Sequence, residues 1–213
     1  YRPPSPDAPS RGRAPRASRE PSAPTEEQLL AEFRRQAGVR RGTRARFRMR
    51  ANFAGDRADE TAHVYGAQIV VVGPGIQGGR SYLTYGIPVP SVEDLVDVSA
   101  ADVTGDGRAE LLFRVRQRFG EVTREVLAVH QVTEQGFPRV LEVEVKRTQG
   151  DRSIENQVLT RRGRLEIRPG RARGWDAQSW SFTRSPQDSA EPLLLPWQDR
   201  AVRYRFRGGR LAR

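Results

Sequence analysis

The chain of 213 residues contains no cysteine and a single lysine, Lys146. Without cysteine, a disulfide framework and a thiolate metal site are both excluded, and cysteine usage does not indicate the redox compartment. The positive charge therefore comes almost entirely from arginine, and the formal net charge at pH 7 is +11. This balance favours anionic partners such as nucleic acid, anionic lipid or acidic polysaccharide, although arginine in place of lysine is also typical of a GC-rich genome.

The sequence also lacks any run of about 18 apolar residues, so we expect no transmembrane segment. It begins at Tyr1 rather than at methionine, which implies a processed or trimmed polypeptide, so the lack of an export signal is uninformative. Hydrophobic residues make up 36% of the chain, below the usual ~45–50% in a count that includes glycine. Part of the chain is therefore expected to bury nothing.

Composition divides the chain into three parts. We predict a disordered Pro/Arg-rich linker at residues 1–24, a short helix with its connection at 25–43, and a single β-rich domain at 44–213. The linker is predicted because its Pro, Ser, Ala, Gly and Arg residues cannot bury enough apolar surface to offset the entropy of ordering. The alternative to a simple tether is an arginine-bearing arm that touches an anionic partner.

The helix is predicted at 26–37. Thr25 can cap its first turn and Gln28 occupies the third position of a capping box, while Gly38 is a plausible stop. Its short apolar stripe centres on Phe33, so a helix of this length needs a surface to dock on. Docking on a neighbouring subunit is one possibility.

From about residue 44 the hydrophobic period changes to two. Phe47, Met49 and Phe53 alternate with arginine and asparagine, which predicts a half-buried strand with its arginines facing water. The same alternation occurs around Leu141–Lys146 and Val202–Arg207. Further strands are predicted at 62–72, 81–87, 110–119, 124–132, 155–160, 163–168 and 178–183.

The predicted fold class is mainly β: an antiparallel meander, sandwich or open barrel with one short N-terminal helix. All-β chains are often built from repeats, which would place further copies of the most distinctive motif at a fixed period. The sequence indicates only one copy and no period of 40–50 residues, so a full propeller is not expected.

That motif runs from Asp102 to Glu110 and places oxygen-bearing groups at relative positions one, three, five, seven and nine. The predicted calcium ligands are the side chains of Asp102, Thr104, Asp106 and Glu110, together with the backbone carbonyl of Arg108. The intervening glycines at 105 and 107 permit the tight backbone that such convergence needs. The alternative is a Gly and Asp turn stabilised by its own hydrogen bonds and empty of metal.

The segment Asp102–Leu111 resembles the calcium loops of FG-GAP and VCBS-type repeats, whose pattern is close to Asp-x-Asn-Gly-Asp-Gly-x-x-Asp-Leu. Two departures are Thr104, where that family usually has Asn or Asp, and the solitary occurrence of the loop. The resemblance implies an exported, β-structured module that takes calcium as its cofactor. A second acidic stretch, Asp56 to Glu60, has irregular spacing and is interrupted by Arg57, so we expect an exposed loop there.

The sequence does not indicate an enzyme. His63 and His130 are predicted on separate strands, and neither a GxSxG nucleophile nor an HExxH zinc motif is present. We therefore expect a non-catalytic cell-envelope or secreted module, periplasmic, outer-membrane-associated or extracellular, that acts in protein binding or in a larger assembly. The alternative is binding of nucleic acid or another anionic polymer through two arginine ladders, Arg46, Arg48, Arg50 and Arg203, Arg205, Arg207.

Overall fold

The computed structural model describes residues 23–182, 185 and 187–213. The predicted linker at 1–24 therefore falls almost entirely outside the described residues. Within them the chain is mainly β, with three antiparallel sheets, one α-helix, and two short 3-10 helices at Gln77–Gly79 and Val92–Asp94. The predicted fold class is confirmed, and the strands follow the meander alternative.

Each sheet is formed largely by strands that are consecutive in the sequence. The first sheet has the order β1 (Phe47–Ala51), β2 (Glu60–Tyr65), β3 (Gln68–Val72), β4 (Leu83–Gly86). The second has the order β12 (Ala172–Arg173), β9 (Arg152–Glu155), β8 (Arg139–Gln149), β7 (Val122–His130), β6 (Glu110–Phe119), β5 (Leu95–Ala101). The third has the order β10 (Gln157–Arg161), β11 (Arg164–Arg168), β13 (Val202–Arg207), β14 (Arg210–Ala212).

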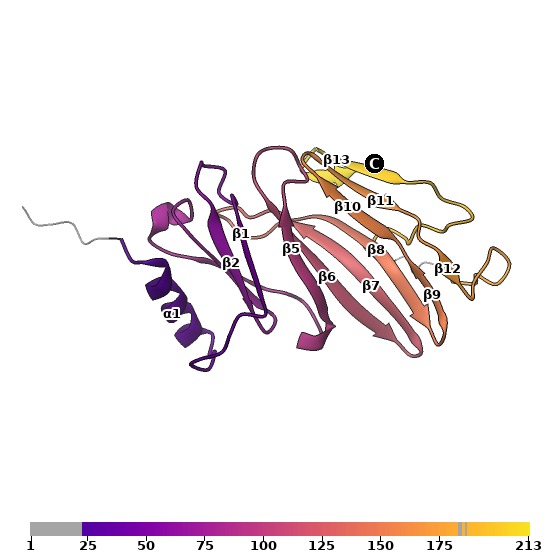
Figure 1. Ribbon diagram of the computed structural model, residues 1–213, viewed down its shortest axis with the longest axis horizontal. Helices are drawn as coiled ribbons and strands as arrows, with labels where there is room; N and C mark the ends of the chain where they lie inside the picture. The colour runs from indigo at the N-terminus through magenta and orange to yellow at the C-terminus, as the bar shows by residue number, and fades with distance from the viewer. Residues whose placement is uncertain (1–22, 183–184, 186) are drawn as a thin grey trace, which may run out of the picture.

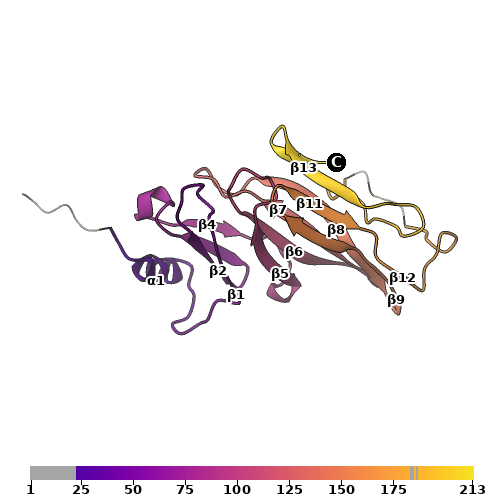
Figure 2. The same cartoon turned by 45° about the horizontal axis from the view of Figure 1, so that its top comes forward.

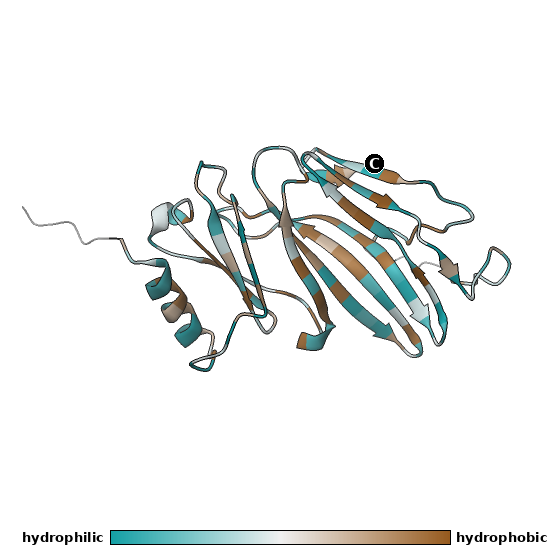
Figure 3. Ribbon diagram, viewed as in Figure 1, coloured by the Kyte–Doolittle hydropathy of each residue, from teal (hydrophilic) through white to brown (hydrophobic). Residues whose placement is uncertain are grey.

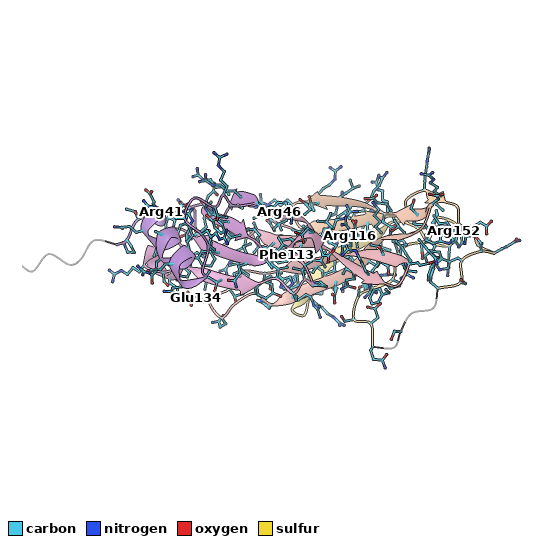
Figure 4. The ribbon with its side chains drawn as sticks, turned by 90° about the horizontal axis from the view of Figure 1, so that it is seen from below. Arg41, Arg46, Phe113, Arg116, Glu134 and Arg152 are labelled. Carbon is cyan, nitrogen blue, oxygen red and sulfur yellow. The ribbon has the colours of Figure 1, made fainter. Side chains whose placement is uncertain are left out.

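The helix, the first sheet and the second sheet follow one another along the long axis, and the third sheet lies against the second (Figures 1 and 2). One apolar cluster, with Val64 and Phe113, joins the first sheet to the second, and another, with Val143 and Tyr204, joins the second sheet to the third. Figure 3 shows apolar stretches in the strands of the second sheet, as expected for a sheet that is covered on both faces. In Figure 4, Arg41 and Arg152 mark opposite ends of the long axis.

Helix α1 (Glu26–Gln36) forms as predicted and docks on its own chain. The capping box is present, with Gln28 N donating to Thr25 Oγ1 at 3.3 Å and Thr25 N donating to Gln28 Oε1 at 2.8 Å. The buried face around Phe33 packs against Tyr65 and Val70 on the outer side of the first sheet. A neighbouring subunit is therefore not needed to cover this helix.

Three strand predictions were wrong in detail. The predicted strand at 62–72 is a hairpin, because the chain turns at Gly66 with φ +61°. The predicted strand at 155–160 is divided at Asn156 between two sheets. No strand occurs in the described part of 178–183, where Trp180 instead packs edge-on against Trp175 in an aromatic cluster.

Candidate functional site

The predicted calcium loop connects β5 to β6 and closes around the carboxylate of Glu110, whose residue is only 1% exposed. Glu110 Oε2 accepts hydrogen bonds from Val103 N at 2.9 Å and Thr104 N at 3.2 Å. Thr104 Oγ1 donates to Oε1 at 3.0 Å. The carboxylate therefore satisfies loop donors that would otherwise be buried without partners.

The two aspartates of the loop also accept backbone hydrogen bonds. Asp102 Oδ1 accepts from Gly105 N at 2.6 Å, and Asp102 Oδ2 accepts from Gly107 N at 3.2 Å. Asp106 Oδ1 accepts from Arg108 N at 2.8 Å. Both glycines have positive φ, +85° and +86°, as the sequence predicted. The donor set suits a hard cation chemically, but these oxygens face N–H groups here, so calcium would have to replace some of these hydrogen bonds.

Calcium binding stays a prediction with a direct test. If the dissociation constant lies in the range of weak extracellular sites, about 0.1–1 mM, then 10 mM calcium stabilises the fold by about 1.4–2.7 kcal/mol. Thermal unfolding with calcium or EDTA should show this shift, and Asp106→Ala should remove it. Asp56→Ala, the equivalent change in the loop described next, is the matched control. An unchanged melting temperature in the native chain would contradict calcium binding.

The β1–β2 loop is a second copy of this loop, 50 positions earlier in the chain. Glu60 Oε2 accepts from Phe53 N at 2.7 Å and from Ala54 N at 3.0 Å, as Glu110 does in its own loop. Asn52 Oδ1 accepts from Gly55 N at 2.7 Å, and Asp56 Oδ1 accepts from Ala58 N at 2.8 Å. The expectation of a single motif without repeat was wrong.

Strand register confirms that the two loops are equivalent. Ala51 pairs with Glu60 in the first sheet, and Ala101 pairs with Glu110 in the second. The stretch Asp56 to Glu60 is therefore not merely an exposed acidic loop, because Glu60 is fully buried. Asn52 and Ala54 replace Asp102 and Thr104, so the shared loop shape depends on the hydrogen bonds and not on a complete set of metal ligands.

Burial raises the pKa of the Glu110 carboxyl, although hydrogen bonds from Val103 and Thr104 act in the opposite direction. Because the pKa is higher in the folded chain, the stability that this residue contributes is present below its ordinary pKa of 4.5 and is lost as pH rises through the folded pKa. Glu110→Gln cannot titrate. In urea unfolding without calcium, we expect Glu110→Gln to become more stable relative to the native chain as pH rises from 4.5. A difference that stays constant with pH would contradict this.

Backbone hydrogen bonds join these loops from one sheet to the next. Ala109 N donates to Asn52 O at 2.7 Å, and Gly163 N, in the β10–β11 turn, donates to Asp102 O at 3.1 Å. Figure 1 shows the two loops and this turn along the same side of the molecule. Each loop therefore helps to position the connection that follows it, and the β5–β6 loop supports the turn of the third sheet.

The third sheet carries an arginine-rich outer face. The registers of its four strands place eleven side chains on the side away from the apolar cluster shared with the second sheet. Seven of them are arginines: Arg161, Arg164, Arg168, Arg203, Arg205, Arg207 and Arg210. We call these seven residues the arginine face. Six of the seven are exposed in the described structure and Arg164 is half-buried, while Tyr204, Ile167 and Leu211 point to the other side.

Only one acidic residue lies among these arginines. Glu166 Oε1 is 2.6 Å from Arg168 Nε, and its Oε2 is 3.1 Å from Arg203 Nε. These hydrogen bonds lower the pKa of Glu166. The side chains of the other five arginines of the face have no hydrogen bond or ion pair to another described residue. Their charge is therefore uncompensated within the described chain.

The two predicted arginine ladders lie on the first and the third sheet, which pack on the second sheet through different apolar clusters. Arg48 and Arg50 lie on β1, on the side of the first sheet that faces α1, and Arg46 immediately precedes this strand. Arg46 donates to Val92 O at 2.5 Å, and Arg50 lies 3.4 Å from Asp59. Figure 4 shows Arg46 in the same half of the molecule as Arg41. The structure does not combine the two ladders into one surface.

One further cavity contains arginines that are paired with acidic residues of the same chain. This cavity, about 880 Å³, is lined in part by Arg124, Arg147, Trp180 and Phe182. Arg147 Nε and Nη2 each lie 2.6 Å from Glu144, and its guanidinium lies over the ring of Phe182. Arg124 is paired with Asp188. This cavity therefore offers less free charge than the arginine face.

The two histidines belong to the packed interior. His130 is 5% exposed, lies 5.2 Å from the rings of Tyr85 and Phe113, and its Nδ1 is 2.9 Å from Phe137 O. His63 is 6% exposed and stacks on Tyr65. Burial lowers the pKa of both histidines.

Within the described ranges, no helix has the length and apolar composition required to cross a membrane. Comparison of the chain with protein-family models, with curated proteins and with solved structures finds no match.

Proposed function

We propose that this chain is a non-catalytic binding module that engages a linear polyanion through the arginine face of its third sheet. The observation that carries the proposal is a face with seven arginines and one glutamate, without a covering layer of described residues. Guanidinium groups match phosphate, sulfate and carboxylate oxygens in a bidentate geometry. A polymer that repeats such groups would contact several of these arginines at once.

The competing interpretation is a solvated end cap. Stacked repeats need a polar outer face at each end for solubility. A face that serves only solubility would carry charges of both signs, because side chains of a single sign repel one another and destabilise the fold. Here five arginines have no acidic partner among the described residues, which favours a ligand that supplies the negative charge. The same charge disfavours a second copy of the chain as the partner.

The composition of the face indicates which part of a polymer it would contact. Its four remaining residues are Gln157, Leu159, Glu166 and Ala212, so it presents no aromatic ring for base stacking. Contacts would then go to the charged backbone and would not depend on sequence. An exported module, as the FG-GAP-like loop implies, would meet acidic polysaccharide or anionic lipid, whereas a cytosolic one would meet nucleic acid.

Salt-dependent binding tests this proposal. Labelled duplex DNA and a sulfated polysaccharide are titrated between 50 and 200 mM NaCl, with uncharged dextran as the control polymer. If about five phosphates are neutralised, the affinity for duplex DNA falls by about 500-fold over this range. Binding of the sulfated polymer alone would favour the exported setting. Absence of binding to either polyanion at 50 mM NaCl would remove the proposal.

A further inference from the structure

The β10–β11 turn forms a concavity whose side chains are all arginine. Its volume is about 430 Å³, and it is lined by Arg161, Arg162, Gly163, Arg164 and Arg205. We call these four arginines the arginine seat. Three of them belong to the arginine face, and Arg162 adds a fourth charge from the turn itself.

Strand pairing forces like charges together in this seat. Arg161 pairs directly with Arg164 across β10 and β11. Leu165 pairs with Tyr204 across β11 and β13, so the next position in the same register places Arg205 beside Arg164. Like charges directly opposite on neighbouring strands are destabilising. Arg162 forms an ion pair with Asp102, at 3.7 Å from its Nε, while the side chains of the other three have no ion pair to a described residue. A bound anion would relieve this repulsion.

The backbone beneath the seat is held in place by the β5–β6 loop. Gly163 N donates to Asp102 O at 3.1 Å, and Gly163 has φ +75°. A Cβ added to Gly105 would lie 2.9 Å from the Cα of Gly163, so the loop and the turn are in close backbone contact. The arginines are thus presented from a supported turn, which reduces the ordering that ligand binding requires.

We propose that the arginine seat binds a phosphomonoester group at the end of the polyanion. This inference rests on the proposed function of the arginine face. A terminal phosphate carries about −1.5 to −2 charges at pH 7, whereas an internal phosphodiester or a sulfate ester carries about −1. Four guanidinium groups around one concavity favour the more highly charged group. Arg207 and Arg210 lie on the neighbouring hairpin, where they would contact the following charges of the polymer.

The test compares two single-stranded oligonucleotides of identical sequence, one with a 5′-phosphate and one with a 5′-hydroxyl. Binding is measured by fluorescence anisotropy at 100 mM NaCl. We expect about 10-fold tighter binding of the phosphorylated strand, and displacement of that strand by inorganic pyrophosphate at lower concentrations than by sulfate. A strand with a 3′-phosphate shows whether either end is accepted.

Arg162→Ala is the diagnostic variant, because the Arg162 side chain is 85% exposed and we expect its removal to change the stability of the fold little. It should abolish most of the preference for the phosphorylated strand and change the affinity for the hydroxyl strand by less than about 3-fold. Equal binding of both strands by the native chain would contradict terminal-phosphate binding at the arginine seat but would not contradict the proposed function. Binding of neither oligonucleotide would also overturn the seat, and failure of every polyanion would overturn the proposed function with it.

Discussion

Replacing Arg161, Arg164 and Arg205 together by glutamate should lower the affinity for duplex DNA by at least about 100-fold at 100 mM NaCl. The three positive charges lie in one row across neighbouring strands and lack acidic partners, so reversal both removes contacts and adds repulsion. The slope of log affinity against log salt should become shallower by about 2.7. The fold should remain stable, since the native row already holds like charges.

The matched control reverses Arg46, Arg48 and Arg50, which changes net charge by the same amount on the first sheet, away from the arginine face. We expect this control to lose less than about 5-fold in affinity, through the long-range field alone. Equal losses in the two triple variants would mean that net charge and not the arginine face determines binding.

Glu60→Ala should destabilise the fold by about 2–4 kcal/mol, because it leaves one buried backbone donor without an acceptor, at about 1–3 kcal/mol, and two partly buried donors that water can reach. The native carboxylate accepts from Phe53 N and Ala54 N, and also from Gly75 N at 3.2 Å. A chain of this size should then lose about 4–16 °C in melting temperature. Urea and thermal unfolding measure the effect.

Two further variants separate hydrogen bonding from general sensitivity to substitution. Glu60→Gln keeps one acceptor oxygen and the side-chain volume, so it should keep most of the stability that Glu60→Ala loses. Glu134→Ala removes an exposed glutamate and should change the free energy of unfolding by less than about 0.5 kcal/mol. If Glu60→Ala is as mild as Glu134→Ala, the carboxylate does not stabilise the loop.

Local patterns in the sequence were sufficient to predict the helix and most strands. The capping residues Thr25 and Gln28 predicted where α1 begins, and alternation predicted β1 and β13. The sequence did not show that residues 62–72 form two strands, because β2 and β3 are both buried on both faces and together look like one apolar run. Only the positive φ of Gly66 divides it.

The repeated loop was missed because its copies share geometry more than residue types. Asn52 replaces Asp102 and Ala54 replaces Thr104, so a search for calcium ligands finds only one copy. The spacing of the glycine, the following aspartate and the closing glutamate is identical in both, and a search for that spacing would have found the pair. The closing glutamate is a buried hydrogen-bond acceptor in each copy.

The outward direction of Arg203, Arg205 and Arg207 could be predicted from alternation, but their neighbours could not. Arg161 and Arg164 reach the same face only through the pairing of β10, β11 and β13, which depends on tertiary contacts between distant segments. The turn sequence Arg-Arg-Gly-Arg at 161–164 was the available signal.

Arginine footprinting of the native chain tests the central claim most directly. The protein is treated with phenylglyoxal with and without bound polyanion at 50 mM NaCl, and modified arginines are identified by peptide mass spectrometry. Binding through the third sheet predicts strong protection of Arg161, Arg164, Arg205, Arg207 and Arg210, with Arg46, Arg48 and Arg50 modified as in the free protein. Protection of the β1 arginines instead, or equal protection of all exposed arginines, would contradict the arginine face as the binding surface.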